Sequence, residues 1–168
     1  MQNVCEKIGV KLKPYSELDE CVRQLAMDAS EDAFHPVSNY LHMNSIVIAY
    51  NDNKSNCRSR FNIAHELGHI VREHVEGSPW NEKEADYFGG YLLAPIPLVI
   101  AHCPELDISG IAEIFGLSFD CAKVVRDHCR NRIACGKPKF PYELGFIDMC
   151  SVKEVRTLDA LKQNNRQE

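Results

Sequence analysis

The chain of 168 residues is long enough for one compact domain of ordinary size, and its apolar fraction of 45% is sufficient for a buried core. Its formal net charge of -5 provides no overall positive field for nucleic acid, so non-specific DNA binding is not the leading expectation. No apolar run reaches the roughly 18 residues that span a bilayer, and the amino-terminal residues lack the apolar stretch of a secretory signal. We therefore expect a cytoplasmic protein without a membrane segment.

The eight cysteines are scattered along the chain, and no two of them form a C-x-x-C pair. The closest pair is Cys129 and Cys135. Without a secretory signal, such a pattern favours reduced thiols in or near the core over a disulfide framework.

The first part of the chain is predicted to contain one helix and a hairpin. Ser16-Glu17-Leu18-Asp19 resembles a capping box, and apolar residues recur after it at helical spacing, which predicts a helix over residues 16–29. The apolar stretch at Tyr40-Leu41, the turn-like residues 42–45 and the apolar run 46–50 then predict a β-hairpin.

Helices dominate the rest of the chain. Apolar periodicity predicts helices over residues 59–74, 81–94, 96–102, 108–115 and 118–132, the first of them closed by Gly77-Ser78-Pro79. Residues 136–141 are typical of a linker, and a capping-box pattern at 151–154 predicts a short helix in a tail with a disordered end. We therefore expect a mostly helical α+β fold with a small sheet. Its domain covers residues 1–135, with a helix pair at 104–133 packed on the core, and a linker and tail cover 136–168.

The stretch from Arg60 to His74 contains the first candidate site. Residues four apart lie on one face of a helix, so His65 and His69 can direct two imidazoles at a single point, with Glu66 adjacent. This H-E-x-x-H pattern is typical of zinc peptidases, in which the glutamate is a general base rather than a ligand. The spacer residues between the histidines are apolar and small, as expected for a buried helix, and buried histidines need a partner.

A catalytic zinc ion usually takes three protein ligands, and His74 is a poor third candidate. It lies five residues beyond His69, whereas the metzincin pattern places its third histidine six residues beyond the second. If the helix continues, His74 lies about 180° around the axis from His65.

The following helix offers a better third ligand. Glu82, Ala85, Asp86 and Gly89 share one helical face, on which the small residues permit close packing. Glu82 could complete the zinc site, and Asp86 could accept the other ring N–H of a ligating histidine. Glu84 lies about 200° from Glu82 and is expected to face solvent. Taken alone, these carboxylates could equally decorate an exposed helix amino terminus, where negative charge is favourable.

Two motifs together resemble a known family. "RSRFNIAHELGHIVREH" followed by "EKEADYFGGYLLAP" is similar to the ImmA/IrrE family of zinc-dependent endopeptidases, which carry R-x-R-F, H-E-x-x-H and E-x-x-A-[ND]-x-F-A-x-x-L-L-x-P. The resemblance covers roughly residues 46–126, including "IAEIFGLSFDCAKVVRDHC". Gly89-Gly90 and Ala94 depart from the family pattern without touching the metal set.

The resemblance implies a zincin-like metallopeptidase core that binds one zinc ion per chain. It assigns His65, His69 and Glu82 as ligands and Glu66 as the catalytic glutamate. Members of the family commonly cleave a transcriptional repressor of a phage, mobile element or stress regulon. The implied partner is therefore a helix-turn-helix repressor, and the implied origin is bacterial or phage.

The residues alone leave two features of a peptidase mechanism open. The donor that stabilises the oxyanion could be Tyr50, His74, Tyr87 or Arg126. The strand at 46–50 could be a sheet edge to which an extended substrate adds, or a plain core strand.

Two other functions are weighed against the peptidase. The segment 108–130 resembles a helix-turn-helix with Gly116 in its turn, so a DNA-binding regulator is conceivable. Its second helix also carries Asp120 and Asp127, and a helix pair packed on the core explains the same periodicity. The other alternative is a non-catalytic, zinc-stabilised module that binds a partner protein.

Overall fold

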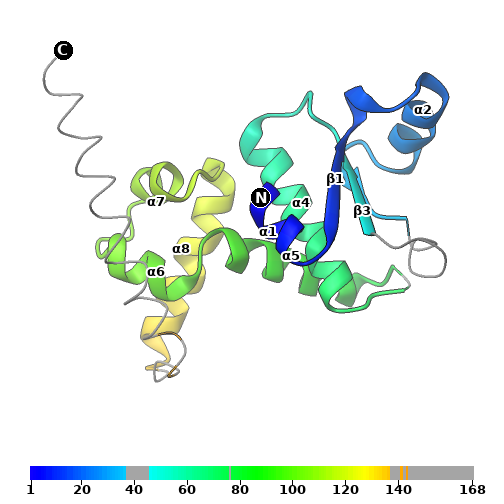
Figure 1. Ribbon diagram of the computed structural model, residues 1–168. Helices are drawn as coiled ribbons and strands as arrows, with labels where there is room; N and C mark the ends of the chain where they lie inside the picture. The colour runs from blue at the N-terminus through cyan, green and yellow to red at the C-terminus, as the bar shows by residue number, and fades with distance from the viewer. Residues whose placement is uncertain (37–45, 76, 137–140, 142, 144–168) are drawn as a thin grey trace, which may run out of the picture.

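The computed structural model describes residues 1–36, 46–75, 77–136, 141 and 143 (Figure 1). The fold is α+β and mostly helical, as predicted. The elements in chain order are α1 (Gln2–Lys7), β1 (Val10–Pro14), the 3-10 helix η1 (Tyr15–Glu17), α2 (Glu20–Ala29), β2 (Ala33–Phe34), β3 (Ile46–Tyr50), α4 (Asn56–Val71), α5 (Pro79–Leu93), α6 (Ile96–His102), α7 (Ile108–Phe115) and α8 (Phe119–Ala134).

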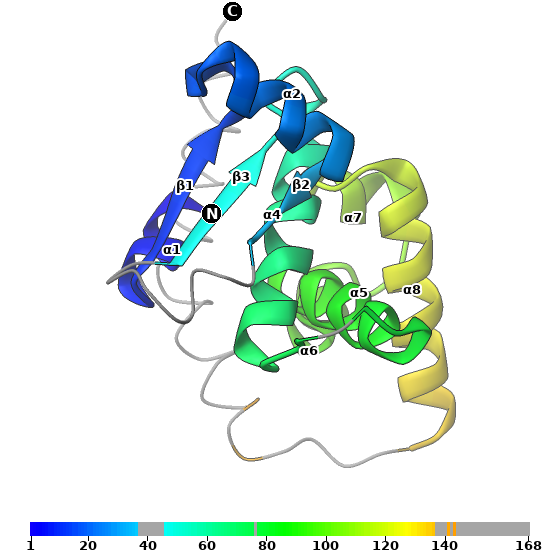
Figure 2. The ribbon, with the colours of Figure 1, turned by 90° about the vertical axis from the view of Figure 1, so that its right-hand side faces the viewer.

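The small sheet has the strand order β1-β3-β2, and Figure 2 shows the three strands side by side. β1 runs parallel to β3, from the pair Val10 and Ile46 to the pair Pro14 and Tyr50. β2 is antiparallel to β3, with Phe34 opposite Ala49. β3 is therefore the middle strand, which agrees with the core-strand alternative for residues 46–50 and not with the sheet-edge alternative. The first strand of the predicted hairpin, at 40–41, lies outside the described residues, and the antiparallel partner of β3 is β2.

The first predicted helix begins later than its capping-box pattern indicated. Ser16 belongs to η1, and α2 begins at Glu20 with Asp19 as its N-cap residue. The reason is a tertiary contact: the backbone N–H of Ser16 donates to Asp52 Oδ1 at 3.1 Å and its hydroxyl donates to Asp52 Oδ2 at 2.6 Å. Because Ser16 serves this distant carboxylate, it does not cap a helix.

α4 is the central helix of the molecule, with the sheet on one side and the carboxyl-terminal helices on the other (Figure 1). On the sheet side, Ile63, Leu67 and Ile70 pack with apolar residues of β1 and β3. On the other side, Ala64 belongs to a second core cluster formed with α5, α6, α7 and α8. The two histidines of the candidate site therefore lie on a helix that is held from both sides.

The helix pair α7 and α8 packs on this second core. Gly116 joins the two helices in a left-handed conformation, with φ of 61°, and Arg60 of α4 donates to its carbonyl oxygen at 2.9 Å. Ile111, Leu117 and Val125 are buried in the same cluster as Ala64. The helix pair therefore shares one core with α4. The predicted domain limits remain a prediction. The predicted tail helix lies outside the described residues.

The thiols agree with the prediction of reduced cysteines. All seven cysteines of the described segments are free, and Cys5, Cys103 and Cys129 are buried; Cys150 lies outside these segments. Burial, with the neighbouring Cys103 thiol, raises the pKa of Cys129 to about 11, so this thiol stays protonated at neutral pH. Among the described residues, no helix has the length and apolar character needed to cross a bilayer.

Candidate metal centre

Two histidines of α4 and one glutamate of α5 converge on one point. The Nε2 atoms of His65 and His69 lie 3.0 Å apart. Glu82 Oε2 lies 3.3 Å from His65 Nε2, and Glu82 Oε1 lies 3.6 Å from His69 Nε2. The structure thus brings together the three residues that the sequence singled out as ligands, in the arrangement of a potential metal site.

The spacing of these donors fits a small divalent metal ion. Two ligands at about 2.05 Å from a tetrahedral metal ion are separated by about 3.3 Å, close to the three separations observed here. Burial lowers the pKa of His69, and the nearby His65 acts in the same direction, so the imidazole is neutral at neutral pH. Neutral imidazoles supply the lone pairs that metal binding requires.

Glu82 reaches the histidines because α5 packs unusually close to α4. A Cβ atom added to Gly68 would lie 2.9 Å from Ala85 Cα, and one added to Gly89 would lie 3.1 Å from the backbone nitrogen of His65. The first contact excludes a Cβ atom at Gly68 unless the backbone shifts, and the second would require the neighbouring backbone to move by a few tenths of an ångström. α5 itself starts at Pro79, with Ser78 as N-cap residue and its hydroxyl accepting from Asn81 N–H, so Ser78-Pro79 begins this helix as well as ending the preceding loop.

Asp86 contacts the first histidine from one turn further along α5. Its Oδ1 lies 2.8 Å from His65 Nδ1. A carboxylate only accepts hydrogen bonds, so His65 donates from Nδ1 and keeps the Nε2 lone pair for a metal ion. This is the position in which the sequence reasoning expected Asp86.

The end of α4 differs from the prediction. The helix stops at Val71 instead of continuing to residue 74. His74 Nδ1 lies 3.0 Å from His69 Nδ1, and its Nε2 lies 3.2 Å from Glu84 Oε2. The expectation that Glu84 faces solvent is therefore wrong: its side chain is 30% exposed, and hydrogen bonds from His74 and Arg72 lower its pKa.

His35 is a residue of the site that the sequence analysis missed. It follows β2 directly, and its Nδ1 lies 2.6 Å from Glu66 Oε2, with both side chains largely buried. Its ring also lies 5.9 Å, centroid to centroid, from the ring of His69. A two-residue strand leaves no periodic pattern, so nothing local in the sequence indicated that this histidine reaches the glutamate of a helix 31 positions away.

The four candidates for the oxyanion donor lie in different surroundings. Tyr50 ends β3 and packs in the sheet-side cluster. Tyr87 is exposed on α5 and stacks on His128, and Arg126 of α8 pairs with its neighbour Asp127. His74, as described above, contacts His69 on the ring nitrogen remote from the cluster. Among the described histidines outside the ligand set, His35 is the one that contacts Glu66.

Comparison with known proteins identifies the family. The family model described as the IrrE N-terminal-like domain, of peptidase family M78, matches residues 16–124, which is more than half of the chain. The chain belongs to the ImmA/IrrE family. No curated protein and no solved structure gives a significant match.

Membership of this metallopeptidase family implies a metal ion. The cluster of His65, His69 and Glu82 is a suitable binding site for it. The matched range contains both the helix with His65 and His69 and the helix with Glu82. Within the described residues, these three are the group whose donor atoms converge closely enough, all within 4.8 Å of one another.

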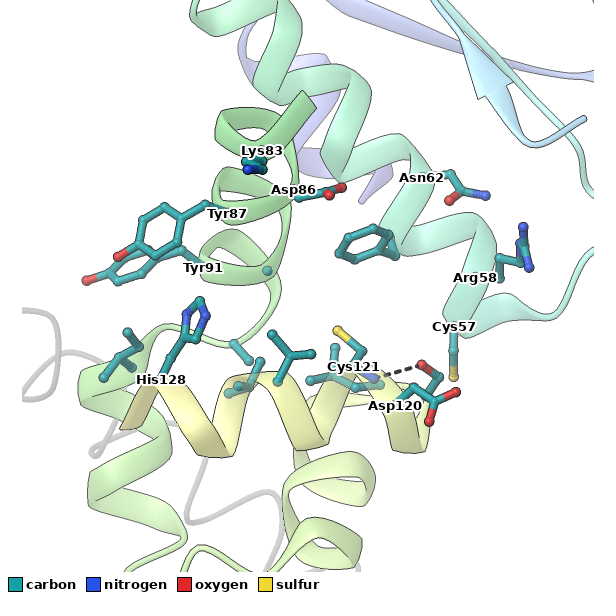
Figure 3. Close-up of a pocket in the computed structure, with 18 of the residues that line it drawn as sticks. Cys57, Arg58, Asn62, Lys83, Asp86, Tyr87, Tyr91, Asp120, Cys121 and His128 are labelled. Carbon is teal, nitrogen blue, oxygen red and sulfur yellow. Dashed lines mark hydrogen bonds between the residues drawn. The ribbon is translucent and has the colours of Figure 1, made fainter. Parts of the chain in front are cut away.

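A groove of about 860 Å³ borders this centre in the ImmA/IrrE chain (Figure 3). α4, α5 and α8 form its walls, and Asp86, the partner of His65, lines it. Figure 3 shows Tyr87 and Tyr91 of α5 above His128 of α8 at one end. The inner face of α8 is therefore directed at the peptidase core, which agrees with the packing explanation for the helix pair.

Proposed function

We propose that this protein is a zinc-dependent endopeptidase. The observation that carries the proposal is the convergence of His65, His69 and Glu82, beside a largely buried Glu66 on the same helix. Two histidines and one glutamate are the ligand set of several catalytic zinc sites, which keep a fourth position open. Zinc is therefore the ion that this donor set favours.

The ligands and Glu66 divide the chemistry between them. A zinc ion held by the three ligands supplies Lewis acidity, which polarises the scissile carbonyl and lowers the pKa of water to about 7. Glu66 takes the proton of the attacking water and delivers it to the leaving amide nitrogen. Glu66 lies on the same helix as His65 and His69 and is close enough to act electrostatically on His69, so its carboxylate is near the point at which the ligands converge.

His35 holds the carboxylate that does this work. Because an ionised carboxylate only accepts, His35 donates from Nδ1 to Oε2 of Glu66. This bond fixes the side-chain rotamer of Glu66 and leaves its other oxygen for the proton of the water. A base fixed in this way loses little freedom when the substrate binds.

We propose that an extended segment of a protein substrate binds along β2. In the described sheet this strand lies at the edge, and it leads directly into His35 beside the site. Backbone hydrogen bonds to a sheet edge give affinity without much sequence preference. The resemblance to the family supports a helix-turn-helix transcriptional repressor as the substrate.

Metal analysis and proteolysis together test the proposal. We expect about one zinc ion per chain in the purified protein, lost in Glu82→Ala and retained in Glu66→Gln. Glu113→Gln, at an exposed position on α7, is the matched control and should behave as wild type. Cleavage of candidate repressors and of unfolded casein should disappear in Glu66→Gln.

Two outcomes would contradict the proposal in different ways. A wild-type protein that takes up no zinc, even when zinc is supplied, would remove the metal centre. Normal zinc content with repressor binding but no cleavage by any preparation would instead support the alternative of a non-catalytic binding module.

A further inference from the structure

We propose that His74 is a positioning residue for His69: it fixes the tautomer and orientation of this metal ligand and is itself anchored by Glu84 of α5. The inference deepens the proposed function and rests on the same metal centre. It concerns the ring nitrogen of His69 that does not face the cluster.

The backbone at the end of α4 is what brings His74 to this place. Glu73 adopts a left-handed conformation with φ of 56°. Its N–H bonds to Ile70 O at 3.1 Å, and the N–H of His74 bonds to His69 O at 3.0 Å. These two bonds define a Schellman turn, in which the second residue after the C-cap residue Arg72 folds back over the third residue from the end of the helix. An apolar contact usually accompanies this turn; here two imidazoles meet instead.

The side chains of His69, His74 and Glu84 form a chain of hydrogen bonds in which each hydrogen can be assigned to one ring nitrogen. If His69 gives its Nε2 lone pair to a metal ion, its hydrogen is on Nδ1 and is donated to His74 Nδ1, 3.0 Å away. His74 then carries its own hydrogen on Nε2 and donates it to Glu84 Oε2 at 3.2 Å. Glu84 only accepts, and Arg72 donates to its other oxygen at 3.1 Å.

Burial of His69 and His74 makes the hydrogen bond between them important for the orientation of His69. The side chains of His69 and His74 are only 10% and 9% exposed, so water does not readily replace either partner. The two rings meet edge to face, with an interplanar angle of 75° and centroids 5.1 Å apart. Such a ring orientation suits a hydrogen bond to His69 Nδ1 and leaves His74 outside the convergence of the Nε2 atoms.

Each histidine ligand therefore has its own partner. Asp86 accepts directly from His65, whereas His69 is held through the imidazole of His74 and the carboxylate of Glu84 in series. Groups that orient metal-binding histidines in this way strengthen metal affinity by roughly 10–100-fold. His74 is expected to contribute an effect of this size without binding the metal ion.

The test compares zinc affinity with the stability of the metal-free chain. Zinc dissociation constants are measured by competition with a chromophoric chelator, the Co²⁺ absorption spectrum reports ligand geometry, and thermal unfolding of the metal-free proteins reports folding. The variants are His74→Ala, which removes the acceptor, and His74→Asn, whose side-chain carbonyl can accept in place of Nδ1. Val75→Ala, at an exposed position next in the chain, is the control.

We expect His74→Ala to weaken zinc binding by about 10–100-fold and to alter the Co²⁺ spectrum, while the metal-free chain still folds and unfolds cooperatively. His74→Asn should recover most of the affinity, and Val75→Ala should change neither. Unchanged zinc affinity in His74→Ala would overturn the inference. So would failure of His74→Asn to recover any affinity, or a loss as complete as in His69→Ala, which would make His74 a ligand.

The wild type separates this inference from the proposed function. If wild-type zinc binding depends on Glu82, the metal centre stands and the His74 variants decide the positioning role. If the wild type binds no zinc, the centre itself fails and the positioning role fails with it.

Discussion

Replacing Gly68 by alanine should push α5 away from α4 and weaken the metal centre. The new methyl group would lie 2.9 Å from Ala85 Cα and 3.2 Å from Ala85 O, which are backbone atoms that cannot rotate away. Reaching ordinary contact at 3.4 Å requires a displacement of about 0.5 Å. Metal–ligand distances tolerate only about 0.2 Å, and Glu82 lies on the same helix, one turn before Ala85. The displacement therefore disturbs the third ligand directly.

The two energetic effects of this substitution oppose each other. Alanine favours a helix over glycine by about 1 kcal/mol. Overpacking of a close contact costs about 1–3 kcal/mol, so we expect a net loss in the free energy of unfolding of up to about 2 kcal/mol. The geometric effect should also weaken zinc binding by at least about tenfold, because ligand displacements well below 1 Å already reduce affinity and rate strongly.

Gly90→Ala is the matched control on the same pair of helices, because a Cβ atom there would meet nothing within 4 Å. Urea unfolding and zinc titration of both variants measure the effects. Gly90→Ala should be as stable as wild type or more stable by up to about 1 kcal/mol, with unchanged zinc affinity. A Gly68→Ala variant that matched Gly90→Ala in both measurements would refute the reasoning from close packing.

Three further predictions follow from other contacts. Replacing His35 by alanine should lower kcat for peptide cleavage by at least about tenfold, while KM and zinc content stay near wild type. His35→Asn keeps a donor near the Nδ1 position and should recover part of the rate. A change confined to KM would contradict the positioning of Glu66. The hydrogen bonds from Arg58 hold the pKa of Asp32 below its ordinary value of 3.8, so the stability they provide is present above that pH and is lost as the pH falls through the lower folded-state pKa. Asp32→Asn should therefore be less stable than wild type in urea at about pH 7, with the difference closing as the pH falls below 3.8 and through the lower folded-state pKa. A difference independent of pH would argue against the ion pair. Because the pKa of Cys129 is raised to about 11, iodoacetamide at neutral pH should modify the exposed cysteines well before this one, as peptide mass analysis would show.

α4 and α5 show which features of the site can be predicted from the sequence. The spacing of His65 and His69 determines that both lie on one face of any helix that forms, and Glu82 and Asp86 share a face for the same reason. Such relations depend on 3.6 residues per turn and need no knowledge of the rest of the fold. The small residues Ala85 and Gly89 even indicated that the two helices pack closely, which the structure shows at the level of backbone contacts.

The errors and omissions concern contacts that local spacing does not encode. Ser16 hydrogen-bonds to Asp52 instead of capping the predicted helix. β3 is the middle strand because β1, a short strand in which apolar residues alternate with lysines, pairs with it in parallel. Both outcomes depend on which distant segment competes best for a backbone or side-chain partner. A single sequence contains no direct signal for that competition.

The residues of the candidate metal centre fall into the same two groups: those that helical spacing predicts and those that only tertiary contacts place. By itself, the sequence determined the two histidines, the adjacent glutamate and the carboxylates of the next helix, because a helix converts spacing directly into shared faces. Only the tertiary structure decided that His35 reaches Glu66 from the end of a two-residue strand, and that a left-handed Glu73 turns His74 back onto His69 and Glu84. These contacts join segments through a sheet edge and a helix end, where a single backbone angle redirects the chain and periodicity no longer applies.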